Sequence, residues 1–230
     1  SRETVSRGPR LSLSTQTSRL DRSDPSDPVS PSPPVRSPVI AAAGDIACSP
    51  SSPNFNGGLG IAAACQQGAT SDLVLARTVD ALLPLGDLQY ENGALADYLI
   101  SYDASWGRLK SISHPAIGNH EYNTPGAVGY FDYFNGVGNS DGAAGARDRG
   151  YYSYDIGSWH MVSLNANCGE IGGCGVGSDE ERWLRADLAA HPNFCVLAYD
   201  HQPRFSSGAG HGNDPALEPL WQALYDANAE

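Results

Sequence analysis

The sequence predicts an α/β fold, because short apolar segments alternate along the chain with segments of helical pattern. The apolar segments include VIAAAGDIA, ALLPLGD and NFCVLAYDH. Each ends in polar residues, as buried strands that run into a loop do. Because the carboxyl ends of strands in an open α/β sheet face one crevice, we expect polar clusters far apart in sequence to meet there.

The individual elements follow from apolar patterning and capping residues. Strands are predicted at 39–47, 81–87, 114–121, 150–167 (two strands joined at Gly157) and 193–201, and helices at 70–80, 94–106, 178–191 and 215–229. Thr70 or Ser71 is a candidate N-cap, and Ser178 with Glu181 has the spacing of a capping box. Pro84 weakens the second strand, because proline cannot donate a ladder hydrogen bond.

Composition divides the chain into two parts. Residues 1–37 are rich in Ser, Pro and Arg and contain almost no periodic apolar residues, so we expect a disordered linker. Residues 38–230 are expected to form one domain. The formal net charge is -12 although the first part is rich in arginine, and such an acidic domain is repelled by nucleic acids and by anionic membranes. No apolar run approaches the roughly 20 residues of a membrane span.

The five cysteines indicate an exported protein. Cys48 and Cys65 bracket a Ser/Pro/Gly-rich loop, and Cys168 and Cys174 bracket a short one, as disulfides often do. Cys195 lies in an apolar run and is predicted to be a buried thiol. The alternative is a cytosolic protein with five reduced cysteines, because pairing cannot be deduced from sequence.

The expected location is secreted or cell-envelope. No signal peptide is visible, and the chain begins at Ser1 rather than Met, so we interpret it as a fragment or a processed form.

The polar clusters contain the residue types of a site for two metal ions: Asp45, Asp87, Asn119, His120, His201. Carboxylates supply charge, one of them can bridge two ions, and amide oxygen and imidazole complete the coordination. A single Gly-Asp pair is often only a turn or a helix cap. The GNHE segment is more specific, because these residues after a buried strand have no obvious role in packing.

In order and spacing, the GD, GD and GNHE motifs and the histidine after a buried strand resemble the calcineurin-like metallophosphoesterase superfamily. The details are similar to its purple acid phosphatase-like branch. The usual histidine two residues after the first aspartate is replaced by Ala47, and GDLQY places Tyr90 where that branch has a tyrosine that ligates ferric iron. The alternative for Tyr90 is aromatic packing at a loop entrance. The resemblance covers about residues 39–230.

The resemblance implies two metal ions, Fe together with Fe, Zn or Mn, and a set of ligands for them. Asp45 and Tyr90 would serve one metal, and Asp87 would bridge both. Asn119 and His201 would serve the second.

The implied reaction is hydrolysis of phosphate esters, by a phosphomonoesterase or a phosphodiesterase that uses a metal-activated water. His120 would protonate the leaving oxygen or stabilise its charge. His211 in the Gly-rich segment SSGAGHGND either binds the substrate phosphate or is an exposed loop histidine. His114, His160 and His191 receive no function, and His160 is expected to be a satisfied histidine of the core or sheet.

The resemblance also implies a two-sheet α/β sandwich of metallophosphoesterase type whose last strand or strands are missing. The family completes its site with a Gly-His-x-His motif, which is expected beyond Glu230, so the fragment is expected to be impaired in metal binding and catalysis. The alternative function is a non-catalytic secreted binding protein that retains the phosphoesterase fold.

Overall fold

The computed structural model describes residues 36–192, 195–208 and 212–229. A compact unit begins at Ser37, and all elements below belong to it. The predicted linker lies outside the described residues except for Arg36 and Ser37, which are both exposed.

The first sheet is parallel and contains β1 (Ile40–Ala43) and β2 (Ala81–Pro84). Isolated parallel bridges from Leu82 to Ser113 and from Leu85 to Ala116 add the predicted strand at 114–121 as a short third segment. Pro84 ends β2, and its carbonyl accepts a hydrogen bond from the Ala116 N–H at 2.7 Å. The proline is therefore tolerated at the end of the strand, where its missing N–H costs little.

The second sheet has the order β3-β4-β5. Strands β3 (Tyr152–Ile156) and β4 (Trp159–Ser163) are antiparallel, and β5 (Cys195–Tyr199) runs parallel to β4. The predicted hairpin is confirmed: Gly157 has a φ of 62°, a conformation that glycine adopts without strain.

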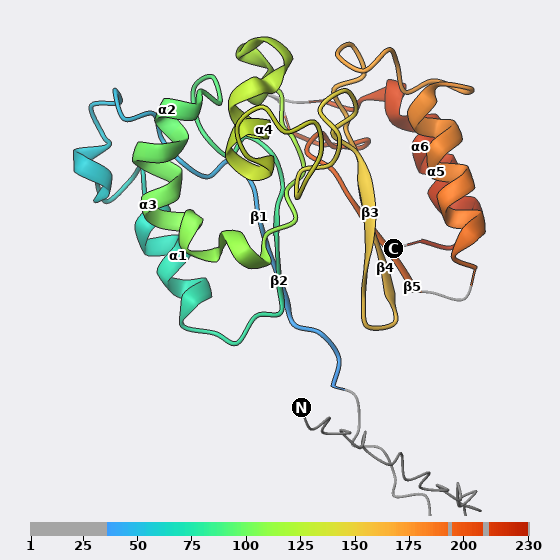
Figure 1. The fold of residues 1–230 in the computed structure, drawn as a ribbon, viewed down its shortest axis with the longest axis horizontal. Helices are drawn as coiled ribbons and strands as arrows, with labels where there is room; N and C mark the ends of the chain where they lie inside the picture. The colour runs from blue at the N-terminus through green and yellow to red at the C-terminus, as the bar shows by residue number, and fades with distance from the viewer. Residues whose placement is uncertain (1–35, 193–194, 209–211, 230) are drawn as a thin grey trace, which may run out of the picture. The chain divides into compact units, whose positions relative to one another are not determined.

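The helical elements flank the strands, with α1 to α4 on one side and α5 and α6 on the other (Figure 1). Their bounds are η1 Asn56–Gly58, α1 Gln67–Leu75, α2 Leu95–Asp97, η2 Tyr98–Tyr102, α3 Asp103–Ser105, η3 Trp106–Ile112, η4 Glu121–Asn123, η5 Pro125–Ala127, α4 Val128–Asn135, α5 Asp179–Ala190, η6 Pro215–Leu217 and α6 Glu218–Asp226. The chain is therefore a mixed α/β protein with two small sheets, as the sequence predicts at that level. None of the helices in the described ranges has the length and apolarity that a membrane crossing requires.

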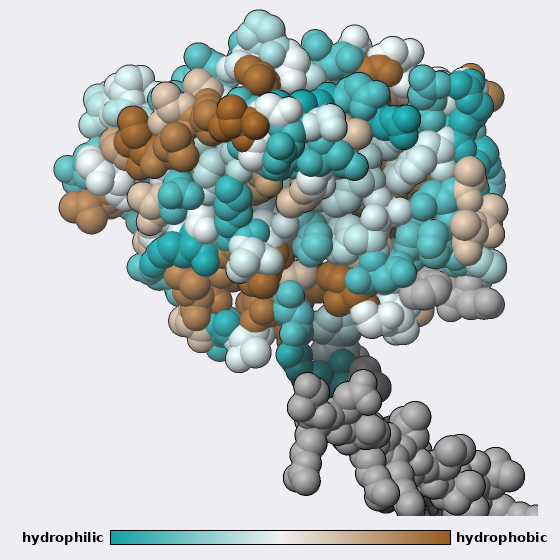
Figure 2. Space-filling model, in the orientation of Figure 1, coloured by the Kyte–Doolittle hydropathy of each residue, from teal (hydrophilic) through white to brown (hydrophobic). Residues whose placement is uncertain are grey.

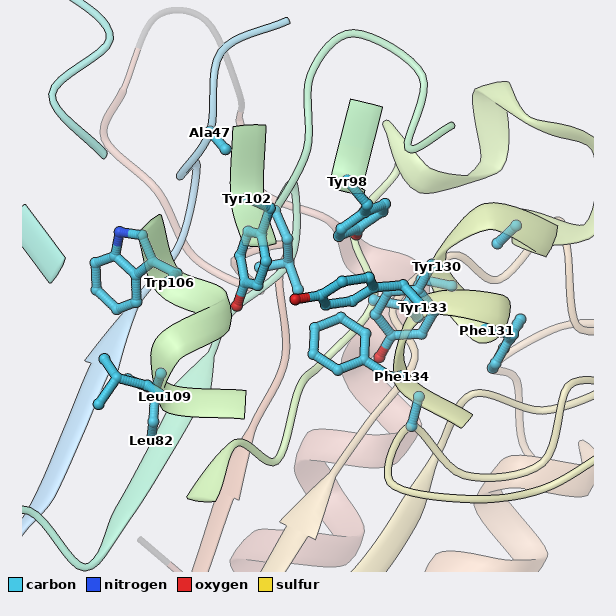
Figure 3. Packing of buried hydrophobic residues seen from close by; sticks show 14 residues of the cluster. Ala47, Leu82, Tyr98, Tyr102, Trp106, Leu109, Tyr130, Phe131, Tyr133 and Phe134 are labelled. Atoms are coloured by element: carbon cyan, nitrogen blue, oxygen red, sulfur yellow. The ribbon is translucent and has the colours of Figure 1, made fainter. Parts of the chain in front are cut away.

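The core consists of three groups of buried side chains. One group lies under α1 to α4 and is mainly aromatic: Figure 3 shows Tyr98, Tyr102, Tyr133 and Phe134 packed against one another, with ring centroids 4.9 to 6.0 Å apart. A second lies between the second sheet and the helices α5 and α6. The third joins side chains of both sheets, so the sheets pack through a shared apolar contact. Exposed apolar side chains gather in a few groups on a surface that is otherwise mostly polar (Figure 2).

One helix prediction was wrong in detail, and one helix was not predicted. Helix α1 begins at Gln67 and ends at Leu75, earlier than predicted at both ends, and Thr70 and Ser71 are not caps. Their hydroxyls donate to backbone carbonyls one turn earlier, for Ser71 to Gly68 at 2.8 Å, a bond that such residues make inside helices. Helix α4 was not predicted, because it is short and five of its eight residues are buried, so only a narrow face carries polar residues.

The cysteines pair as their spacing indicated. Disulfides join Cys48 to Cys65 and Cys168 to Cys174, an arrangement typical of secreted and extracellular proteins. The prediction for Cys195 was wrong, because it is exposed. It is the first residue of β5, where the strand starts opposite Trp159 and the side chain points out of the core.

Candidate functional site

Two aspartates at strand ends form the base of the candidate site. Asp45 follows β1 and Asp87 follows β2, and the Asp45 N–H donates to the Gly86 carbonyl at 3.1 Å. Both have positive φ, 54° and 50°, in the left-handed region that few non-glycine residues occupy. Backbone strain of this kind concentrates at functional sites. Asp45 is exposed, whereas Asp87 is only 4% exposed.

Tyr90 joins the two aspartates. Its hydroxyl lies 2.5 Å from Asp45 Oδ1 and 3.3 Å from Asp87 Oδ2. Its backbone N–H donates to the carbonyl of Ala47 at 2.9 Å. Ala47 is fully buried. The alanine and the tyrosine are thus hydrogen-bonded neighbours, and the phenol occupies the space beside Asp45.

Asp87 is also paired with histidines from two other loops. His201 follows β5 and places Nε2 at 3.3 Å from Asp87 Oδ2, while its Nδ1 bonds to the Leu85 carbonyl at 2.8 Å. Burial lowers the pKa of His201, but Asp87 and the Leu85 carbonyl outweigh it and raise the pKa to about 9. Burial raises the pKa of Asp87, but His201 and the backbone N–H of His120 outweigh it, so that pKa lies below its usual value.

His120 faces the same carboxylate through its ring. Nδ1 lies 2.7 Å from the Glu91 carbonyl oxygen, which can only accept, so Nδ1 carries the proton. Nε2 then points toward Asp87 Oδ2, at 3.8 Å, and the ring packs edge-on against Tyr90 at 4.5 Å. The His120 N–H donates to Asp87 Oδ1 at 2.9 Å.

Sequence reasoning missed Glu121, the last residue of GNHE, which does have a role in packing. Its fully buried carboxylate accepts backbone N–H groups from Asp87 at 3.0 Å, Leu88 at 2.8 Å and Gly118 at 2.9 Å, and the Tyr98 hydroxyl at 3.1 Å. Burial and the charge of Asp87 raise the pKa of Glu121, and the N–H donors oppose them. Glu121 therefore fixes the loop after β2 to the loop that carries His120.

Two glycines of the motifs are required by close approach. A Cβ on Gly86 would lie 2.6 Å from the ring of His201, and one on Gly118 would lie 2.2 Å from the N–H nitrogen of Asp87. Gly86 and Gly118 thus each make room for a neighbouring site residue. A Cβ on Gly44, the glycine of the first GD pair, would instead lie nearest to the Leu85 carbonyl oxygen, at 3.1 Å. The sequence shows the glycine before Asp87 and before Asn119, but it does not reveal which residue packs against that glycine.

Two predicted site residues, Asn119 and His211, are not among the side chains that hydrogen-bond to Asp45 or Asp87 in the described part of the chain. Asn119 is exposed next to His120, and its carbonyl accepts from the Tyr122 N–H at 3.2 Å. His211 lies outside the described residues. The structure thus brings together five of the sequence-predicted residues, namely Asp45, Asp87, Tyr90, His120 and His201.

The donor set fits metal ions. The Tyr90 phenol oxygen lies within hydrogen-bonding distance of two carboxylates, and two imidazoles face one of these, Asp87. Burial and the two carboxylates raise the pKa of Tyr90 far above its usual value, so the phenol stays protonated without a cation. A cation among these oxygens would reverse that effect, because a bound metal ion is the largest charge in its site.

A second group of metal-ligand types lies elsewhere. Donor atoms of Asp155, His160 and His191 lie within 4.8 Å of one another. His160 is satisfied as predicted, since its two ring nitrogens lie 2.8 Å from Asp155 Oδ1 and 2.7 Å from Asp187 Oδ2. Burial lowers the pKa of His160, but these carboxylates outweigh it and raise the pKa.

Comparison with known proteins adds a fold likeness. No known protein family and no curated protein matches the chain. A similar solved structure is described as "GAP50 the anchor in the inner membrane complex of Plasmodium", with 12% identity and a TM-score of 0.50. The match covers 83% of this chain and 62% of that chain, so this chain spans less than two thirds of that structure's length. At this identity the likeness concerns the fold alone.

The role of Glu121 can be tested by Glu121→Gln. Both oxygens of the Glu121 carboxylate accept hydrogen bonds, whereas a glutamine amide has one accepting oxygen and one NH₂ group that only donates. The donors that face the NH₂ group lose their acceptor. We therefore expect the free energy of unfolding to fall by on the order of 3 kcal/mol. Urea denaturation measures this, with Glu170→Gln, at an exposed position, as the control. Equal stability of the Glu121→Gln variant and the parent would contradict the role.

Proposed function

We propose that this chain hydrolyses phosphate esters with a dinuclear metal centre, as a member of the purple acid phosphatase-like branch of the calcineurin-like metallophosphoesterases. The observation that carries the proposal is the contact of Tyr90 with both Asp45 and Asp87. Asp45 lies in the loop after β1, whereas Asp87 and Tyr90 lie in the loop after β2, and turn or capping roles would not require side chains of the two loops to meet. The chain has Ala47 where the family has a histidine ligand, and the Tyr90 phenol in contact with Asp45 would take the place of that ligand.

The proposed ligands follow from this arrangement. Asp45 and Tyr90 would hold one ion and Asp87 would contact both. His201 and Asn119 would hold the second. The ions, Fe with Fe, Zn or Mn, would supply positive charge that polarises the phosphoryl group and makes a water more acidic. Tyrosinate favours ferric iron as one of them.

His120 has the orientation that a proton donor to the leaving oxygen needs. The Glu91 carbonyl fixes Nδ1, so Nε2 is the nitrogen that faces the site. The Tyr90 ring and the backbone hydrogen bond to Asp87 restrict where His120 can move. An imidazolium Nε2–H held there would protonate or stabilise the departing alkoxide.

We also propose a two-sheet sandwich architecture and a location outside the cytoplasm. Apolar side chains of both sheets pack in one cluster, and helices flank both sheets, which supports a two-sheet α/β sandwich of metallophosphoesterase type. The two disulfides support a secreted or cell-envelope protein.

A non-catalytic binding role is the second candidate. It is favoured by the likeness to a structure described as an anchor. The fold can be kept while the chemistry is lost. Metal-dependent turnover separates the two candidates.

Asp87→Asn should abolish metal-dependent hydrolysis of p-nitrophenyl phosphate and of its bis-ester. The substitution removes the charge that both ions would share, while the amide nearly preserves shape. Activity assays with Fe, Zn and Mn measure the loss. The control is Asp148→Asn, whose side chain is 78% exposed, and it should keep parental activity. A folded parent that binds these metals but shows no turnover with any of them would favour the binding role.

His120→Gln should lower kcat mainly for esters with poor leaving groups. Loss of a general acid costs on the order of 10²-fold or more for an alkyl ester, and less for p-nitrophenolate, which needs little protonation. Comparing kcat for a series of leaving groups measures this dependence. An equal loss of kcat for all leaving groups would assign His120 to another role.

A further inference from the structure

A second cluster of imidazoles and carboxylates lies at the opposite end of the second sheet from the candidate site. Asp155 on β3 and His160 on β4 are cross-strand partners, and His191 directly follows α5. His160 is near the start of β4, whereas His201 follows the end of β5, which runs parallel to β4. The two sites are therefore separated by the length of the strands.

Asp187 contacts both histidines of the cluster. Its Oδ2 lies 2.7 Å from His160 Nε2, and its backbone carbonyl lies 2.7 Å from His191 Nδ1. Asp187 is itself held by the Ser153 hydroxyl, which donates to Oδ1 at 2.8 Å. The two imidazoles stack with centroids 3.8 Å apart.

We propose that Asp155, His160 and His191 bind one divalent transition-metal ion of the Zn²⁺ type, and that Asp187 orients the two imidazoles for it. The site is independent of the proposed phosphoesterase centre. Two imidazoles and a carboxylate are a ligand set that zinc accepts in a tetrahedral site, with water as the fourth ligand.

The hydrogen bonds of Asp187 are those that a metal site requires around its ligands. A metal-ligating histidine donates its other N–H to a carboxylate or a backbone carbonyl, and both kinds of acceptor are present. A carbonyl oxygen only accepts, so His191 carries its proton on Nδ1 and its lone pair on Nε2. His160 directs Nε2 to Asp187 and Nδ1 to Asp155, and the metal would replace the proton on Nδ1.

The donors can close around one ion only if the His191 ring turns out of its stack on His160, because imidazole lone pairs lie in the ring plane and two stacked rings cannot both aim at one ion. Zn–N and Zn–O bonds of about 2.0–2.1 Å at tetrahedral angles place the donor atoms about 3.3 Å apart. The present donors lie within 4.8 Å, and Asp155 Oδ1 is 2.8 Å from His160 Nδ1. His160 is fixed, with 1% of its side chain exposed, whereas Asp155 exposes 47% and His191 exposes 30%. The two outer ligands therefore make the adjustment.

A bound ion would connect three elements. It would join the β3–β4 hairpin to the end of α5, and it would stabilise the folded chain because the unfolded chain does not assemble the site.

The test is Zn²⁺ titration of the EDTA-treated full chain carrying Asp87→Asn, which removes a central ligand of the proposed phosphoesterase centre. We expect one Zn²⁺ equivalent by calorimetry, a rise in Tm, and an anomalous zinc peak among the three side chains in a crystal. His191→Ala should abolish all three. Asp187→Asn should weaken binding by about 10–100-fold.

The matched control is His114→Ala, which removes a histidine that stacks on Tyr154 outside the cluster. It should leave Zn²⁺ binding unchanged. Asp155→Asn, at a half-exposed side chain, provides the same test if His191→Ala does not fold. The proposal is overturned if the folded Asp87→Asn chain binds no Zn²⁺, or if removing a cluster ligand leaves the affinity and the Tm shift unchanged.

Discussion

The Glu121 carboxylate is the acceptor on which the geometry of the candidate site depends. It is fully buried and accepts N–H groups from the loop after β2 and from the loop before η4. These donors would otherwise be unsatisfied, which is costly in the interior. The result is that Asp87 and His120 keep a fixed relation, reinforced by the hydrogen bond from the His120 N–H to Asp87 Oδ1 at 2.9 Å.

The rest of the site is built on this fixed point by close backbone packing. Gly86 and Gly118 lack the Cβ atoms that would collide with His201 and with Asp87. The left-handed backbone at Asp87 turns its carboxylate toward Tyr90 and the histidines. The site thus concentrates acidic oxygens that repel one another, which supports the proposed metal centre.

Sequence reasoning could identify the residues of the site but not the contacts that hold them. The strand-end rule placed Asp45, Asp87 and His201 at one edge, because polar residues after buried strands are visible in the pattern. Glu121 was not recognised, since its acceptor role depends on loops more than 30 residues apart in sequence. Helix α4 was missed for a related reason: its aromatic residues are buried by tertiary packing, which leaves only a narrow polar face.

The measurement that tests the central claim most directly is the visible spectrum of the protein with ferric iron. If the Tyr90 phenol joins Asp45 and Asp87 at a metal ion, adding ferric iron should produce a phenolate-to-iron charge-transfer band. The band should disappear in Tyr90→Phe and persist in Tyr122→Phe, a tyrosine that instead bonds to Asn165. A band of equal strength in Tyr90→Phe, or the lack of any band in the folded parent, would contradict the account.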